Sequence, residues 1–504
     1  MPLTQALKNR RIQNPAKAAI AFGEQSCNYR DFDGLTDNIA ASLLAAGAEP
    51  GDRVALHLLN GPELALSYIG CLKAGCVVVP VNTRLKGYEI DYILRHSGSA
   101  WYIGQPELYT AIIEYCPALA ALDQRYITGG TSNCVFHAFS DLLRMPNRSF
   151  NLSAVSPEQT AAILYTSGTT AQPKGVMHSH RTLMETANAM RDICLDENQV
   201  VLIMSSMMHM IGFAMLFLPA LVHGATAVIT RPYEFRSSLR ACERWGCTYM
   251  LGLPAMFHKL LESQIANPHN MSSGRFYFCG GDSVSAALQQ TFQSRLGPIC
   301  EVYGSTEIAP ATWCRPGDER VGSIGKPGKN TAFRLMQPNG SEAEPGAVGE
   351  LWIRGPHLMT GYWQDAESTA SALHDGWFRT GDLARRDADG FYWFAGRQKE
   401  IIVRGGSNIS PQEVEAVLYQ HPAVAEVGVV GRPHLLWGET VTAHVVLRPG
   451  CELKQADLIA FARQRLADYK TPEEVIFQSE LPKGLSGKIQ RRALREAAYA
   501  HMEV

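Results

Sequence analysis

The sequence lacks an excess of either charge, and this absence argues against a nucleic-acid-binding protein. Lysine and arginine number 46 and aspartate and glutamate 48, so the formal net charge is −2. Nucleic-acid-binding domains usually carry a clustered basic face. The twelve cysteines are scattered, and no two have the Cys-x-x-Cys spacing of a metal or redox site. We therefore expect reduced thiols, a cytoplasmic location and no nucleic-acid partner.

Targeting and membrane signals are missing as well. Residues 1–13 contain basic residues but no apolar run, so we expect no secretory signal. The segment Val200–Thr230 has no Asp, Glu, Lys or Arg and is long enough to span a membrane. However, His209, Pro219 and two glycines interrupt it. We therefore predict a strand, a turn and a buried helix here, and no transmembrane segment.

The 504 residues, 46% of them hydrophobic, suffice for two or three domains with large cores. Up to about residue 340, helical and strand patterns alternate, which predicts mostly parallel sheets with helices on both faces. The helices are expected near residues 29–46 and 62–74, and the strands near residues 53–59, 76–80, 161–164, 248–253, 276–279 and 299–302.

After about residue 340 the pattern changes to short strands and turns. Asp389-Gly390 lies between residues 383–387 and 391–394, which predicts a hairpin with a two-residue turn. Farther on, a compact α/β unit is expected, with a helix at residues 411–419 and strands at 424–430 and 440–447.

The run from Tyr165 to Gly175 combines hydroxyl residues, Gly168 and Lys174 after an apolar, strand-like stretch. Such a loop can aim backbone N–H groups, hydroxyls and an ammonium at a polyphosphate. It is not a Walker A loop, because Pro173 precedes the lysine and Gly175 follows it. A plain surface loop rich in Ser, Thr and Gly is the alternative.

Further short motifs follow in a fixed order. They are Tyr303-Gly-Ser-Thr-Glu307, Tyr362, Thr380-Gly-Asp382, Gly396-Arg397 and Leu485-Ser-Gly-Lys488. The ordered set resembles the adenylate-forming superfamily of acyl-CoA synthetases, aryl-CoA ligases, firefly-type luciferases and peptide-synthetase adenylation domains. The resemblance covers nearly the whole chain and is strongest to bacterial fatty- or aryl-acid CoA ligases.

This resemblance implies an α/β fold with two domains. Residues 1–397 would bind ATP and the acyl group, in mostly parallel sheets flanked by helices plus a small β-barrel-like part. Residues 398–504 would form a small, mobile, catalytic α/β domain that turns about a hinge near Lys399.

The resemblance also implies a reaction. A carboxylic acid, fatty or aryl, would be activated by ATP as acyl-AMP with release of pyrophosphate, and the acyl group would then pass to CoA as a thioester. The first step brings two anions together, so the site must supply positive charge and Mg²⁺. ATP, Mg²⁺ and CoA are therefore the expected cofactors, with a small-molecule acid as substrate; the sequence leaves a homodimer open.

Roles for individual residues are carried over from the family. Lys488, Thr306 and Glu307 are expected to be catalytic, and Glu307 is expected to hold Mg²⁺ together with Thr170. Asp382 and its partner Arg397 would bind the ribose. The other ATP-binding residues are expected to be Thr166, Ser167, Gly168, Thr169, Thr170 and Lys174 around the phosphates, and Tyr303 and Gly304 near adenine.

The thiol half-reaction would use other residues. Gly405 and Gly406 would leave a channel for pantetheine, and Trp437 and Tyr469 are candidates for contacting CoA, although core or interface packing explains both aromatics equally well. Two positions depart from the family pattern: Ala171 replaces a frequent Gly, and Gly484 replaces a frequent Thr. Neither change removes a charge, so we expect altered kinetics rather than an inactive enzyme.

The acyl pocket is expected around His209, Gly212, Gly280 and Gly281. Methionines near His209 suit an adaptable apolar pocket, although core packing explains them almost as well. Three other functions remain open: an enzyme that loads a carrier protein instead of CoA, a non-catalytic nucleotide sensor of the same fold, and a luciferase. The retained Lys488 argues against a sensor, because a protein that only binds nucleotide does not need it.

Overall fold

The structure is a computed structural model. It describes residues 3–144, 155–166, 173–281, 284, 286–317, 320–398, 400–404, 407–434, 438–466, 468–484 and 487–500. The chain forms two compact units: Met1–Ala332 with Ile353–Phe378, and Phe333–Trp352 with Arg379–Val504. The expected division after residue 397 stays a prediction, and Lys399 lies outside the described residues.

The first unit contains two large sheets. One has, among the described residues, nine strands in the order β16-β15-β14-β13-β12-β10-β11-β1-β2, and its pairs from β14 to β1 are parallel. Its strands are β1 (Ala18–Phe22), β2 (Gln25–Asn28), β10 (Val200–Ile203), β11 (Thr226–Ile229), β12 (Tyr249–Gly252), β13 (Phe276–Gly280), β14 (Ile299–Ser305), β15 (Ile308–Trp313) and β16 (Lys326–Pro327).

The other sheet has the order β19-β9-β8-β4-β3-β5-β6-β7 within the described ranges, with antiparallel pairs only at the β9 and β19 edge. Its strands are β3 (Arg53–His57), β4 (Val77–Pro80), β5 (Trp101–Gly104), β6 (Gln124–Ile127), β7 (His137–Ala138), β8 (Thr160–Thr166), β9 (Lys174–Ser179) and β19 (Gly361–Tyr362). The predicted parallel sheets are confirmed.

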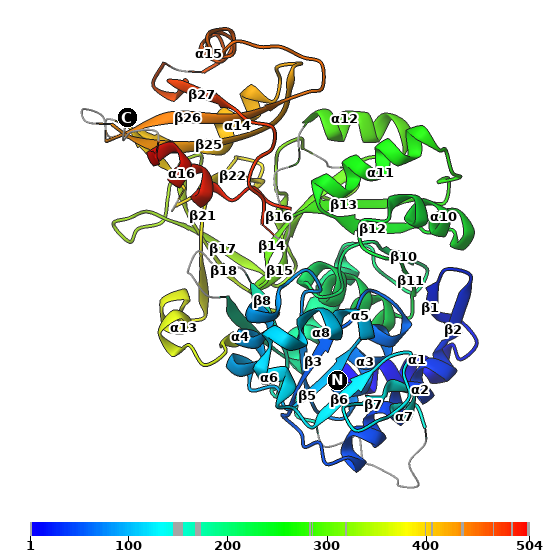
Figure 1. Cartoon of the computed structure of the whole chain (residues 1–504). Coiled ribbons are helices and arrows are strands. Elements are labelled where there is room, and N and C mark those ends of the chain that lie inside the picture. The colour runs from blue at the N-terminus through cyan, green and yellow to red at the C-terminus, as the bar shows by residue number, and fades with distance from the viewer. Residues whose placement is uncertain are drawn as a thin grey trace. The chain divides into compact units, whose positions relative to one another are not determined.

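Helices cover both faces of these sheets (Figure 1). Along β10, Val201 and Ile203 join one core cluster while Leu202 joins another, as the two-residue period of a strand requires. The helices of this unit are α1 (Leu3–Gln13), α2 (Tyr29–Ala45), α3 (Pro62–Lys73), α4 (Gly87–Ser97), α5 (Pro106–Ile112), η1 (Ile113–Tyr115), α6 (Pro117–Ala120), α7 (Phe139–Leu142), α8 (His180–Asp192), η3 (Ile211–Phe217), α9 (Leu218–His223), α10 (Phe235–Trp245), α11 (Pro254–Ala266), α12 (Ala286–Arg295) and α13 (Ala366–Ala372).

The uncharged segment Val200–Thr230 folds as predicted, into β10, a turn, a buried helical stretch and β11. The helical stretch begins as a π-helix, η3, and continues as α9. Tyr68 fixes it: its ring stacks on Phe213 at 4.1 Å, and its hydroxyl donates to the Met207 carbonyl at 2.6 Å. Within the described ranges, no helix is long and apolar enough to cross a membrane.

The second unit has strands of 3 to 11 residues, so the predicted change to short strands holds only in part. β17 (Ala332–Met336), β18 (Val348–Arg354), β21 (Trp377–Arg386) and β22 (Tyr392–Arg397) are neighbours in one sheet, and the short strand β20 (Leu373–His374) pairs with the start of β21. The predicted hairpin is confirmed, because β21 and β22 pair antiparallel and Gly390 has the left-handed φ of 83° that favours glycine.

The C-terminal part of the second unit is the expected α/β unit. A core of branched aliphatic side chains lies between its sheet and helices. Its elements are β23 (Ile402–Arg404), β24 (Ser407–Ile409), α14 (Pro411–Leu418), β25 (Val424–His434), β26 (Gly438–Leu447), α15 (Gln455–Arg463), η4 (Asp468–Lys470), β27 (Glu474–Phe477) and α16 (Arg491–Ala500).

Candidate active site

A tight turn in the first unit carries Thr306 and Glu307. Ser305 and Ile308 are partners in the antiparallel pair β14–β15, so the two residues between them form the turn. Gly304 allows this close return, because a Cβ there would lie 2.8 Å from the Ala309 Cβ. The turn therefore presents a hydroxyl and a carboxylate at the end of a parallel strand, where α/β sheets commonly bind ligands.

Glu307 is held by residues that lie far away in the sequence. The Tyr362 hydroxyl donates to Glu307 Oε1 at 2.9 Å, and the Met359 N–H donates to the Glu307 carbonyl at 2.8 Å. Burial raises the pKa of the Tyr362 hydroxyl above its ordinary value, and the Glu307 charge raises it further. The phenol therefore stays protonated and remains the donor in this hydrogen bond.

His178 holds the other residue of the turn. Its Nε2–H donates to the Thr306 carbonyl at 2.8 Å, because a carbonyl can only accept, and its Nδ1 lies 3.3 Å from the Thr182 hydroxyl. Burial lowers the pKa of the His178 ring. A neutral ring with the proton on Nε2 satisfies both contacts.

Lys174 is the first residue of β9 and is the Cα partner of Thr166 in the ladder with β8. Its ammonium donates to the Ser368 hydroxyl at 2.6 Å and lies 5.0 Å from the centre of the Tyr362 ring. Asp365 caps the helix that bears Ser368, accepting from the Ser368 N–H at 2.9 Å. Hydrogen bonds from Ser368 lower the pKa of the Asp365 carboxyl.

Several expected site residues lie outside the described residues, and their positions stay predictions. They are Ser167, Gly168, Thr169 and Thr170 of the phosphate loop, the neighbouring Ala171, the hinge residue Lys399, and Gly405, Gly406 and Trp437 of the expected CoA channel.

His209 contacts Asn82, whose amide nitrogen lies 3.4 Å from His209 Nε2. Burial lowers the pKa of the His209 ring, which favours the neutral form that can accept this hydrogen bond. The neighbouring Met207, Met208 and Met210 belong to the core cluster of the first unit. Core packing therefore accounts for these three methionines.

The three expected pocket glycines have structural reasons of their own. A Cβ at Gly280 would lie 2.0 Å from the Val302 carbonyl oxygen of the next strand, and one at Gly212 would lie 2.3 Å from the Ser206 carbonyl oxygen. Gly281 has a left-handed φ of 80°, and a Cβ there would lie 2.8 Å from Leu253 Cδ2. Backbone geometry thus requires glycine at these positions, and their place in an acyl pocket stays a prediction.

In the second unit the expected ribose pair is in contact. Asp382 and Arg397 are partners across β21 and β22, and the Arg397 Nε lies 3.1 Å from Asp382 Oδ1. A hydrogen bond also fixes the Asp382 backbone, because its N–H donates to the Thr380 hydroxyl at 3.0 Å. The Asp382 side chain is 9% exposed and that of Arg397 49% exposed, so the carboxylate is the fixed member of the pair.

Lys488 is exposed on a small hairpin of the second unit. Lys483 and Ile489 form an antiparallel bridge, and the Gly484 N–H donates to the Lys488 carbonyl at 2.8 Å. The backbone is thereby fixed while the lysine side chain remains at the surface. Tyr469, 42% exposed, accepts a hydrogen bond from Arg404 through its carbonyl at 3.0 Å.

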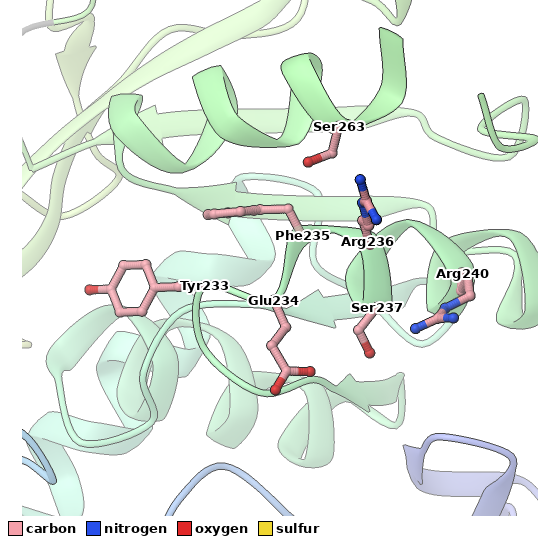
Figure 2. Close-up of a pocket in the computed structure, with 7 residues that line it drawn as sticks. All are labelled: Tyr233, Glu234, Phe235, Arg236, Ser237, Arg240 and Ser263. Carbon is pink, nitrogen blue, oxygen red and sulfur yellow. The ribbon is translucent and has the colours of Figure 1, made fainter. Parts of the chain in front are cut away.

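A surface hollow of about 370 Å³ lies at the start of α10. Figure 2 shows Arg236, Arg240 and the ring of Tyr233 around it, with Ser263 on the neighbouring helix. Arg236 and Arg240 are exposed, and neither has an ion-pair or hydrogen-bond partner in the part of the chain that the structure describes. Arg84 lies 5.8 Å from the centre of the Tyr233 ring. Glu234 also lines the hollow, which therefore combines two cations with one carboxylate.

Sequence reasoning missed several residues of this arrangement. Tyr362 belongs to one of the sequence motifs but has no predicted role, and no sequence pattern points to His178, Ser368 or Asp365. Tyr362 is 55 positions from Glu307, and Lys174 is 194 positions from Ser368. No local pattern predicts contacts at such separations; the pairing of β9 with β19 brings these residues together.

Comparison with known proteins agrees with this geometry. The family model described as AMP-binding enzyme matches residues 7–363, and the model of the AMP-binding enzyme C-terminal domain matches residues 413–488. The chain is 33% identical to an indoleacetate–CoA ligase of Aromatoleum aromaticum over 98% of both proteins. It is also 33% identical to a long-chain-fatty-acid–CoA ligase of Bacillus subtilis, over 96% of this chain and 92% of that protein.

A solved structure supports the same relationship. The crystal structure of the anthranilate CoA ligase AuaEII in complex with anthranoyl-AMP matches 100% of this chain and 98% of its own, with a TM-score of 0.92 and 28% identity.

Proposed function

The chain belongs to the AMP-binding enzyme family of adenylate-forming acid–CoA ligases, and from this premise we propose that it activates an apolar fatty or aryl acid at the turn that carries Glu307. It is an ATP-dependent acyl-CoA synthetase that acts through an acyl-AMP intermediate. The proposal concerns the class of acid and the role of each residue.

The contacts of Tyr362 are the observation that carries this proposal. One phenol contacts both the ammonium of Lys174 and the carboxylate of Glu307. An ammonium matches the charge of a phosphate group, and a half-buried carboxylate matches that of a metal ion. The phosphate group and the metal ion would be present together when ATP binds as its Mg²⁺ complex.

Glu307 fits Mg²⁺ in its donor chemistry. Mg²⁺ in nucleotide sites is usually held by one or two carboxylates together with substrate phosphates and water. Among the described residues no group of three or more metal-binding side chains exists, so the protein itself would supply few ligands. When bound, the ion would neutralise phosphate charge; Lys174 would orient the β- and γ-phosphates, and Thr306 would orient the α-phosphate.

Asp382 fits the ribose. A carboxylate can accept hydrogen bonds from two adjacent hydroxyls at once, and Arg397 keeps one of its oxygens in place. Tyr303 and Gly304 on β14 are the proposed adenine contacts. Lys488 is the proposed catalytic lysine, because a long ammonium can follow the charge that develops as the acid attacks the α-phosphate.

The region near His209 would contact the acid. A neutral ring and neighbouring apolar side chains provide no cation for a second carboxylate, and this supports an apolar acid over a diacid. CoA is proposed to approach through Gly405 and Gly406, with Trp437 and Tyr469 as contacts.

A panel of acids, scored by pyrophosphate release with and without CoA, tests the proposal. We expect fatty or arylacetic and benzoic acids to give pyrophosphate and, with CoA, a thioester. A preference for acetate, malonate or an amino acid would contradict the proposed acid class. Adenylation without transfer to CoA, but with transfer to a carrier protein, would support the carrier-loading alternative instead.

A further inference from the structure

Tyr362 has one hydrogen-bond partner for its hydroxyl in the part of the chain that the structure describes, and that partner is Glu307. The residue is 9% exposed, so its hydroxyl could not simply turn to water without moving the ring. A tyrosine that served only to fill the core would not need this hydroxyl, because phenylalanine would pack as well.

The backbone of Tyr362 is held on both sides. It pairs with Val176 of β9, its N–H donates to the Thr369 hydroxyl at 2.9 Å, and the next N–H, of Trp363, donates to the Gly175 carbonyl at 2.8 Å. The strand that fixes Tyr362 is therefore the strand that begins with Lys174. A shift of that strand would move the ammonium and the phenol together.

Lys174 and Glu307 carry opposite charges, yet they form no salt bridge within the described structure. Both contact Tyr362, one at the ring and the other at the hydroxyl. Glu307 has no ion-pair partner among the described residues, and Lys174 uses its ammonium on Ser368. A carboxylate that a neutral phenol orients keeps its charge available for a cation.

We propose that Tyr362 is a positioning residue for the adenylation step. Its hydroxyl orients the Glu307 carboxylate toward the Mg²⁺ that accompanies ATP. Its ring keeps the Lys174 ammonium apart from that carboxylate, so the phosphate-binding and metal-binding charges do not neutralise each other. This inference rests on the proposed roles of Lys174 and Glu307.

The mechanism follows from general metal chemistry. A carboxylate that binds a metal ion through one oxygen is commonly held through the other by a hydrogen-bond donor, and loss of that donor typically weakens metal binding about 10- to 100-fold. The ring adds a cation–π contact to an ammonium within about 6 Å of its centre. Tyr362 combines both contacts in one side chain.

The test is calorimetric titration of ATP into the full-length chain, without the acid substrate, at several Mg²⁺ concentrations. In the wild type, Mg²⁺ should increase the affinity for ATP. In Tyr362→Phe this increase should fall about 10-fold or more, while the affinity for metal-free ATP stays unchanged. In Tyr362→Leu the affinity for metal-free ATP should fall too, because Lys174 and Glu307 can then pair.

A matched control removes a buried tyrosine hydroxyl elsewhere in the same unit. Tyr102 bonds to His57 Nδ1 at 2.9 Å, far from the motif residues in the sequence. Tyr102→Phe should lower the melting temperature about as much as Tyr362→Phe and leave the Mg²⁺ effect intact. A second variant, Glu307→Gln, should abolish the Mg²⁺ effect, and adding Tyr362→Phe to it should change nothing further.

The possible outcomes distinguish a failure of the proposed metal role of Glu307 from a failure of the proposed role of Tyr362. A wild type whose ATP affinity ignores Mg²⁺ would overturn the proposed metal role of Glu307 and this inference with it. A wild type that responds to Mg²⁺, with Tyr362→Phe responding equally, would overturn this inference alone. A further loss of ATP affinity when Tyr362→Phe is added to Glu307→Gln would also overturn it.

Discussion

The buried carboxyl of Glu301 should make the unfolding free energy depend on pH. It lies on β14, the strand that leads to the Thr306–Glu307 turn, and it is 6% exposed. Its Oε1 accepts from the Gln289 side chain at 2.9 Å and from the Gly322 N–H at 3.2 Å. Burial raises the pKa of this carboxyl from its ordinary 4.5 to about 8, although both hydrogen bonds oppose the rise.

A carboxyl whose pKa is raised on folding stabilises the fold less as the pH rises. Below about pH 4.5 the carboxyl is protonated in both states and the effect is absent; between pH 4.5 and 8 only the unfolded chain loses the proton. Each pH unit between pH 4.5 and pH 8 lowers the unfolding free energy by about 1.4 kcal/mol. Over the whole range the unfolding free energy falls by on the order of 5 kcal/mol.

Glu301→Gln should remove this dependence. A glutamine has the same shape, keeps an acceptor for Gln289 and Gly322, and provides an N–H donor where the protonated carboxyl has its hydroxyl. We expect the variant to match the wild type near pH 5 and to exceed it in unfolding free energy by a few kcal/mol at pH 8.

Urea unfolding at pH 5, 6, 7 and 8 measures the difference. Glu107→Gln, an exposed glutamate on α5, serves as the control and should unfold in parallel with the wild type. A gap between Glu301→Gln and the wild type that stays constant from pH 5 to pH 8 would refute the reasoning, because it would show that Glu301 does not change protonation on unfolding.

Two further predictions concern catalysis. Lys488→Ala should reduce acyl-adenylate formation by about 10²- to 10³-fold and largely spare thioester formation from supplied acyl-adenylate; equal loss in both half-reactions, measured separately, would contradict the role. Asp382→Asn should raise the KM for ATP about 10-fold or more by weakening charge-assisted hydrogen bonds to the ribose, and an unchanged KM would exclude that contact.

The sequence predicted the sheets well because their strands are locally encoded. The runs at residues 76–80 and 276–279 are apolar and bounded by turn residues, and both became strands with parallel neighbours on each side. In the segment Val200–Thr230, interrupting polar residues, proline and glycines argued against a transmembrane helix. The segment folds as a strand, a helical stretch and a strand. Each of these predictions depends only on residues a few positions apart in the sequence.

The pocket glycines stay predictions, because the structure gives each of them a second reason to be glycine. The sequence suggested that Gly280 and Gly281 leave room for a substrate, but the structure gives them other constraints. Gly280 lies against the backbone of β14, and Gly281 has a left-handed φ. A larger residue at Gly281 would strain the backbone whatever the space beside it. The effect of a Gly281 substitution on substrate preference could not be separated from its effect on folding. Such substitutions are therefore poor tests of acyl length.

Leu253 offers a better test of acyl length. Its Cδ2 is the nearest atom to the position that a Gly281 Cβ would occupy, and Ile211 Cδ1 lies 3.8 Å from the same position. Leu253→Ala shortens a side chain without demanding a special backbone conformation, since Leu253 has an extended φ of −81° and ψ of 155°. If this side chain borders the acyl site, the variant should shift kcat/KM toward larger acids, by about 0.8 kcal/mol for each added methylene that becomes buried. An unchanged preference across a homologous series, in a variant that melts like the wild type, would place the acyl group elsewhere.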